Sequence, residues 1–215
     1  MFDICLHTGQ GSEAIDWFIE LKKEFNSKGI SVIAFTLNEE LGKAWQGKGM
    51  YDFIVLPEYK GEINIPEAAE FAKSLGISNF RSLYQTPQVF YDLSEEFCQR
   101  KMACYIHALQ GLKDVPKAKI YWTYGGDEFD HNCLRLLSRM HNGKTIYSQS
   151  ANIKGRMVIF KNEDRYWKIP SNSIPEPEEE EVEWIKNYIV EYTKAKTILW
   201  GNPKDRDIKW EWNYP

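Results

Sequence analysis

Residues 3–14 have the sequence DICLHTGQGSEA, in which a short apolar segment ends at His7 and a turn containing Gly9 and Gly11 follows. Beyond the turn, apolar residues recur at helical spacing as far as Phe25. Gly29 ends this pattern directly before a second apolar segment at residues 30–35. A strand, a turn, a helix and a second strand form a βαβ unit, and the two strands of such a unit are parallel.

The same alternation continues along the chain, which predicts a parallel sheet covered by helices. Further strands are expected at residues 52–57, 119–124 and 144–149, and a sixth at 156–161; helices are expected at 38–45 and 129–141. We therefore predict an α/β fold: a doubly wound, Rossmann-like parallel sheet of five or six strands, with helices on both faces and a C-terminal helix.

The middle of the chain interrupts this alternation. Residues 66–75 and 94–112 have helical patterns, and Ser94 stands where an N-cap is expected. Between them, residues 76–92 are rich in aromatic side chains and lack a clear period, so we expect an irregular aromatic loop.

One domain boundary is predicted near residue 170. Residues 171–181 are rich in Ser, Pro and Glu, and an amphipathic helix is expected at 182–195. We assign 1–170 to the Rossmann-like domain and 171–215 to an acidic linker, a C-terminal helix and a tail. The glutamates at 176 and 178–181 are interpreted as a solvated helix start, where the helix dipole favours them, rather than as a metal site.

Composition and charge exclude several classes of function. The net charge is −4 and basic residues do not cluster, so no nucleic-acid or anionic-membrane partner is expected. No apolar run is long enough to span a membrane, and residues 1–10 have no signal-peptide pattern, so we expect a cytoplasmic protein without a transmembrane segment. The four cysteines lack C-x-x-C spacing, which is typical of reduced, buried thiols.

Two glycine turns mark the expected binding crevice. In a doubly wound sheet this crevice lies at the carboxyl ends of the strands where the strand order reverses, here between the first and fourth strands. The first turn, Gly9-Gln10-Gly11, begins a G-x-G-x-x-A pattern between a strand and a helix, which suits phosphate binding and equally a plain tight turn. The second turn contains Gly125 and Gly126. Its acids, Asp127 and Glu128, suit either a general base and hydroxyl-orienting pair or a helix cap, and the two roles are compatible.

His7 ends the first strand, so it is a candidate acid, base or hydrogen-bond donor in the same crevice, although a single histidine at a strand end also suits a structural role. The other histidines, His107, His131 and His141, share no ligand spacing with a second candidate ligand. We therefore expect no bound metal.

Several passages occur in an order that points to one family. They are the first glycine turn, the basic and then apolar segment from Lys73 to Phe80, the turn Gly125-Gly126-Asp127-Glu128 after an apolar strand, residues 152–159, and a closing helix around 188–192. In this order they resemble the N-terminal half of a GT-B-type glycosyltransferase of capsular or surface polysaccharide biosynthesis.

Proteins of that family have two Rossmann-like domains, of which the first offers acceptor-side groups and the second holds a nucleotide-sugar donor. The resemblance implies a saccharide acceptor, no cofactor in this chain, and a donor-binding domain or chain as partner, because too few residues follow Tyr192 for a second domain. It implies that Asp127 or Glu128 positions or deprotonates the acceptor hydroxyl.

Two alternatives remain open. One is a non-catalytic carbohydrate-binding or assembly module that uses the aromatic residues 80–91 as stacking surfaces. The other is a nucleotide-dependent oxidoreductase that binds pyrophosphate at the first turn; the lack of an acid at residues 36–38, after the second strand, counts against it.

Overall fold

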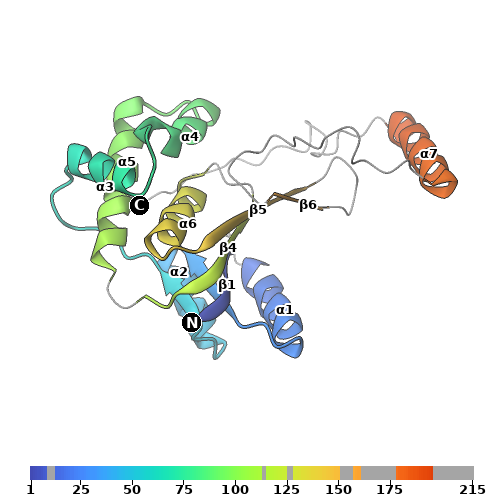
Figure 1. Ribbon diagram of the computed structural model, residues 1–215, viewed down its shortest axis with the longest axis horizontal. Coiled ribbons are helices and arrows are strands. Elements are labelled where there is room, and N and C mark those ends of the chain that lie inside the picture. The colour runs from blue at the N-terminus through green and yellow to red at the C-terminus, as the bar shows by residue number, and fades with distance from the viewer. Residues whose placement is uncertain (9–12, 113–114, 125–127, 151–156, 161–177, 196–215) are drawn as a thin grey trace. The chain divides into compact units, whose positions relative to one another are not determined.

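The computed structural model describes residues 1–8, 13–112, 115–124, 128–150, 157–160 and 178–195 (Figure 1). Its sheet has the order β3-β2-β1-β4-β5-β6. The strands are β1 (Phe2–His7), β2 (Val32–Thr36), β3 (Phe53–Val55), β4 (Ala118–Tyr124), β5 (Lys144–Ser150) and β6 (Met157–Phe160). β1 to β5 pair in parallel, which confirms the predicted doubly wound, Rossmann-like sheet.

The helices connect these strands as expected for βαβ units. They are α1 (Glu13–Ser27), α2 (Glu39–Gly47), α3 (Ile65–Ser74), α4 (Gln85–Phe90), α5 (Glu95–Gly111), α6 (Phe129–Met140) and α7 (Glu179–Ala195), with a short 3₁₀ helix, η1 (Phe80–Leu83). Side-chain caps begin several of them: Asn38 Oδ1 accepts from Glu40 N at 2.9 Å, and Ser94 Oγ accepts from Phe97 N at 3.2 Å.

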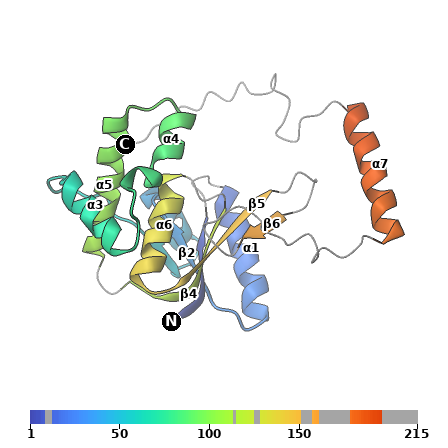
Figure 2. The same cartoon turned by 45° about the horizontal axis from the view of Figure 1, so that its top comes forward.

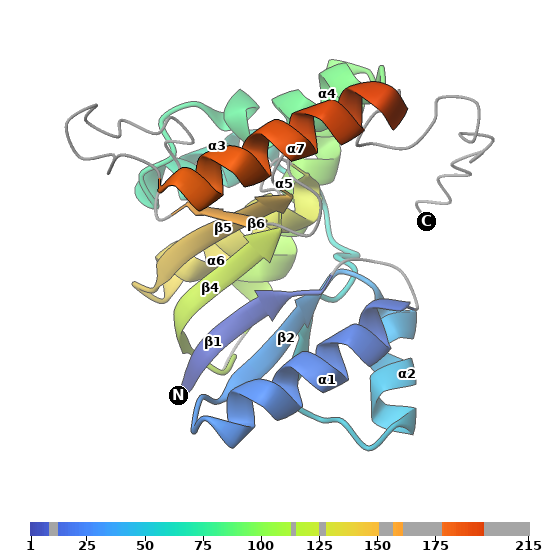
Figure 3. The same ribbon diagram turned by 90° about the vertical axis from the view of Figure 1, so that its right-hand side faces the viewer.

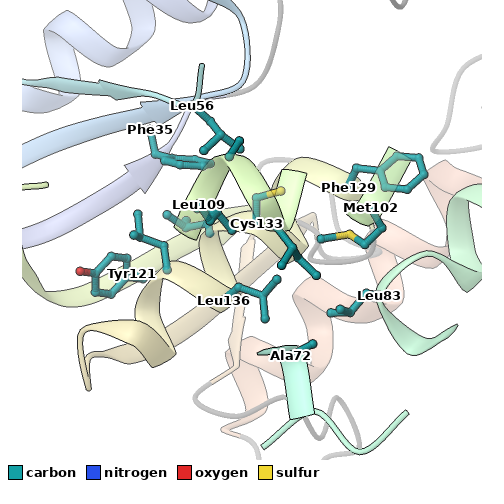
Figure 4. Close-up of a cluster of buried hydrophobic side chains, with 14 of the residues drawn as sticks. Phe35, Leu56, Ala72, Leu83, Met102, Leu109, Tyr121, Phe129, Cys133 and Leu136 are labelled. Carbon is teal, nitrogen blue, oxygen red and sulfur yellow. The ribbon is translucent and has the colours of Figure 1, made fainter. Parts of the chain in front are cut away.

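Helices cover both faces of the sheet (Figures 2 and 3). Each face has its own apolar core. On one face Ile4 and Leu6 of β1 pack with Phe18 of α1 and Trp45 of α2. On the other face Cys5 of β1 joins a larger core with α3, α5 and α6 (Figure 4). Because alternate residues of a strand point to opposite faces, His7 lies on the same side as Cys5, facing α6.

The prediction of an irregular loop at residues 76–92 is wrong, because the structure has the helices η1 and α4 there. Short helical turns in this segment do not bury one continuous apolar stripe, so their sequence shows no period. Asn132 of α6 donates its side-chain N–H to Leu83 O at 2.9 Å, which ties the segment to α6. The aromatic segment is therefore fixed to the same helix that lies beside His7.

By inter-residue contacts the chain divides into two compact units, residues 1–149 with 157–163, and residues 150–156 with 164–215. The boundary predicted at 170 falls among residues 161–177, outside the described part. In the second unit the expected C-terminal helix is α7, on which Trp184 and Ile189 are exposed. No helix among the described residues is long and apolar enough to cross a membrane.

The four cysteines are all free thiols. Cys5, Cys98 and Cys133 are buried, and Cys104 is partly exposed. Burial raises the pKa of the Cys5, Cys98 and Cys133 thiols, because a thiolate is poorly solvated in an apolar core. The three buried thiols are thus held in their protonated, unreactive form.

Candidate functional site

The site lies where β1 and β4 end side by side. The two strands pair in parallel, with Leu6 opposite Trp122, so the next residues, His7 and Thr123, continue the register at the carboxyl edge. The other neighbour of β1 in the sheet is β2, and the other neighbour of β4 is β5. The strand order therefore reverses between β1 and β4. Ligands of doubly wound folds bind at such a point. That this chain binds a ligand here stays a prediction.

α6 begins at this edge because its first residues are suited to a helix start. Glu128 is the N-cap residue and Asp130 lies in the first turn, where the positive end of the helix dipole favours a carboxylate. Cys133, Leu134 and Leu137 are completely buried and hold the helix against the sheet. Apolar packing along α6 thereby places the polar residues of its first turn beside the end of β1.

His7 and Asp130 form a buried pair. Nε2 of His7 lies 2.9 Å from Oδ2 of Asp130, and the two side chains are 4% and 6% exposed. A buried carboxylate requires partners, and Asp130 has a second one, because its Oδ1 accepts the backbone N–H of His131 at 2.8 Å. The carboxylate of Asp130 is therefore fixed in position, and it fixes the imidazole of His7.

His131 is the third member of the cluster. Its ring lies perpendicular to that of His7, with 4.6 Å between the ring centroids, and its Nε2 is 3.8 Å from Asp130 Oδ1. Its Nδ1 accepts the backbone N–H of Glu128 at 3.3 Å, as part of a capping box between Glu128 and His131. His7, Asp130 and His131 thus place three ionisable side chains in contact at one edge of the sheet.

Glu128 links this cluster to the aromatic segment. Its Oε1 accepts the hydroxyl proton of Tyr91, the residue after α4, at 2.7 Å. The structure therefore gives Glu128 the cap position that the sequence indicated, together with a contact that the sequence did not indicate. The other role considered for it, that of an acid/base group, stays a prediction.

Thr123 adds an unsatisfied polar atom at the same edge. It is 0% exposed, and its Oγ1 makes no hydrogen bond to any residue in the described part of the chain. Buried hydroxyl groups normally have a partner, so such an atom calls for an explanation such as a bound water, ion or ligand. In the register of β1 and β4 it lies next to His7.

Other candidate residues fall outside the described part of the chain. Asp127, which was predicted as a catalytic group, is one of them, and so are Gly9, Gln10, Gly11, Gly125 and Gly126 of the two glycine turns. Their expected roles stay predictions. The turns flank the cluster in sequence, because residue 9 is two positions after His7 and residue 127 is three positions before Asp130.

Sequence reasoning missed the partner of His7. Asp130 and His131 are 123 and 124 positions away from it, so no local spacing relates them. The reason given for expecting no metal, the lack of a ligand cluster, does not hold, because His7, Asp130 and His131 could together hold a metal ion. The only available signal was an adjacent Asp-His pair at the helix start after β4, where a parallel sheet would place it near the end of β1.

Comparison with known proteins gives no relative. No family model, no curated protein and no solved structure matches the chain. Function is therefore inferred from the geometry at the ends of β1 and β4.

Proposed function

We propose that this chain provides the acceptor side of a glycosyl-transfer reaction, with His7 as the general base and Asp130 as the residue that orients it. The observation that carries the proposal is the buried contact of 2.9 Å between His7 Nε2 and Asp130 Oδ2 at the strand-order reversal. A histidine held by a carboxylate at one nitrogen can accept a proton at the other. The order of sequence passages that resembles a GT-B-type N-terminal half supports the choice of a saccharide hydroxyl as the proton donor.

The proposed step uses both ring nitrogens of His7. Nε2–H donates to the Asp130 carboxylate, which leaves the lone pair on Nδ1 to accept a proton; no described residue forms a hydrogen bond with Nδ1. The acceptor hydroxyl gives its proton to Nδ1 while its oxygen bonds to the anomeric carbon of the donor sugar. The bond from that carbon to the phosphate breaks, and the nucleoside diphosphate leaves. Asp130 stabilises the imidazolium formed in this step.

The tip of β2 favours this proposal over dinucleotide chemistry. A dinucleotide site needs an acid there for the ribose, but Asn38 follows the strand, and its Oδ1 accepts from Glu40 N and Leu41 N as the cap of α2. The side chain of Asn38 is thereby engaged in holding the helix start. The nucleotide-dependent oxidoreductase is therefore tested only through NADH, as a competing ligand in the binding experiment.

Binding is tested by saturation-transfer NMR on the purified chain. The probes are glucose, galactose, N-acetylglucosamine and their β-linked disaccharides, with NADH as the competing ligand. We expect transfer to at least one saccharide, accompanied by a shift of the His7 ring signals and not of those of His107. Transfer to NADH alone would support the oxidoreductase reading, and transfer to no saccharide would overturn the proposal.

Chemistry is tested with a donor-binding half present, by release of nucleoside diphosphate from a nucleotide sugar. His7→Asn should lower kcat about a hundredfold or more, the size of a lost general base, and leave saccharide binding in place. Asp130→Asn should also lower kcat. A neutral amide neither fixes the His7 tautomer that carries the proton on Nε2 nor stabilises the imidazolium as a carboxylate does. His107→Asn is the control. Unchanged turnover in His7→Asn would show that His7 is not the general base.

A non-catalytic carbohydrate-binding role is the second candidate, and the aromatic segment favours it. Phe90 is 74% exposed and lies edge-to-face with Tyr91, the residue bound to Glu128. An exposed aromatic ring beside a polar site offers a flat apolar face for a sugar. Phe90→Ala should weaken saccharide binding, whereas Tyr51→Ala should not: Tyr51 is equally exposed but precedes β3, at the opposite edge of the sheet. Equal binding by the Phe90→Ala variant and the unmodified chain would exclude this role.

A further inference from the structure

We propose that His7, Asp130 and His131 form a binding site for one transition-metal ion of the zinc class. Each residue offers one ligand atom, and the three atoms lie within 4.8 Å of one another. The side chains are 4%, 6% and 12% exposed, so the cluster is withdrawn from bulk water. The site stands on this geometry and does not depend on the proposed glycosyl transfer.

The chemistry of the three donors selects the class of ion. Two imidazole nitrogens and one carboxylate oxygen suit Zn²⁺, Co²⁺ or another ion of that group, whereas Mg²⁺ and Ca²⁺ prefer sites made of oxygen. Three protein ligands leave one tetrahedral position for water or a substrate atom, which is the pattern of catalytic rather than structural zinc sites. Thr123 Oγ1, which has no hydrogen-bond partner among the described residues and lies beside His7 on the adjacent strand, can accept a hydrogen bond from such a water.

The carboxylate is already oriented for binding. Asp130 Oδ1 accepts the backbone N–H of His131 at 2.8 Å, which directs Oδ2 toward His7. Hydrogen bonds of this kind, outside the ligand set, hold the ligands of metal sites in place. β1 provides one ligand and the first turn of α6 provides the other two, so the packing of α6 on the sheet assembles the site.

Metal binding and the base role of His7 exclude each other. An ion bound at Nε2 of His7 replaces the hydrogen bond to Asp130 and moves the ring proton to Nδ1. In His131, coordination through Nε2 likewise places the proton on Nδ1, so the bond from Glu128 N is lost. The metal-bound form therefore has a weaker start of α6 and no free base, and the metal-free form keeps the His7–Asp130 pair.

The test is titration of the chelator-treated chain with Zn²⁺ by calorimetry and with Co²⁺ by visible absorption. We expect one ion per chain, an intense d–d band typical of four-coordinate Co²⁺, and a higher Tm with Zn²⁺ than without it. His131→Asn should lower the Zn²⁺ affinity about a hundredfold or more, because it removes a ligand. It should also abolish the Zn²⁺ shift in Tm.

The chain has four histidines, which provides matched controls. His107 bonds to Asn64 and His141 to Tyr121, away from the cluster, so His107→Asn and His141→Asn should bind Zn²⁺ as the unmodified chain does. Absence of binding by the folded, unmodified chain would overturn the site, and so would equal affinity in His131→Asn. His131→Asn retains the His7–Asp130 pair, so its response to saccharides separates failure of the metal site from failure of the proposed function.

Discussion

At the start of α6, the side chain of Glu128 has a partner from a distant part of the chain. Its Oε1 accepts the hydroxyl proton of Tyr91 at 2.7 Å. Glu128→Ala removes this acceptor and also the side-chain half of the capping box with His131, so it should lower the free energy of unfolding by about 1–3 kcal/mol. Glu128→Gln should cost less, because the amide oxygen still accepts the bond. Urea unfolding followed by circular dichroism measures both changes.

A double-mutant cycle shows whether this stability change belongs to the contact itself. Tyr91→Phe removes the donor hydroxyl with little loss of volume. If Tyr91 and Glu128 act through their mutual bond, the double variant Tyr91→Phe with Glu128→Ala should cost less than the sum of the single variants. Strict additivity would show that the two side chains stabilise the fold independently.

Helix α2 packs closely against β3 at Gly42. A Cβ atom at this position would lie 2.6 Å from Val55 Cγ2 and 3.3 Å from Phe53 Cε2, both on β3. Gly42→Ala should therefore destabilise the protein by about 1–3 kcal/mol through overpacking, despite the better helix propensity of alanine. Thermal unfolding measures the change.

Gly47, on the same helix, is the matched control for this substitution. A Cβ atom there would meet nothing within 4 Å. Gly47→Ala should thus be neutral, or stabilising by up to about 1 kcal/mol, because alanine loses less entropy in a helix. A stabilising Gly42→Ala would show that α2 can move away from β3 without loss, contrary to the close packing described above.

For the whole molecule, His141 makes stability depend on pH. Burial lowers its pKa, with a further contribution from the charge of Lys117. Its Nδ1 also lies 2.5 Å from the Tyr121 hydroxyl, which accepts the Ala118 N–H. The unfolded chain, with the ordinary pKa of 6.5, takes up the proton first as the pH falls. The free energy of unfolding should therefore be fully retained above about pH 6.5 and decrease below it, until the folded protein is protonated as well.

His141→Asn provides the comparison, because asparagine does not titrate. The difference in unfolding free energy between the two proteins, measured from pH 8 to pH 5, should change only below about pH 6.5. A constant difference over this range would show that His141 has the same pKa in the folded and the unfolded chain.

Local patterns in the sequence were sufficient to predict the fold of the sheet. The alternation of apolar strands and helices identifies each βαβ unit, because helix and strand periods are properties of neighbouring residues. Glycines such as Gly29, where φ is +72°, mark the ends of the elements. Caps at Asn38 and Ser94 depend on a few adjacent backbone groups, so they are equally local. The strand-order reversal between β1 and β4, with His7 at the end of β1, follows from the fold alone.

Tertiary structure alone decided what His7 contacts. Asp130 and His131 reach it because β1 pairs with β4 and the buried stripe of α6 sets the rotation of that helix on the sheet. A contact between residues 123 positions apart depends on how the elements pack, so the residues next to His7 in the sequence do not predict it. The same holds for the bond between Tyr91 and Glu128, which joins a segment without sequence period to the first turn of α6.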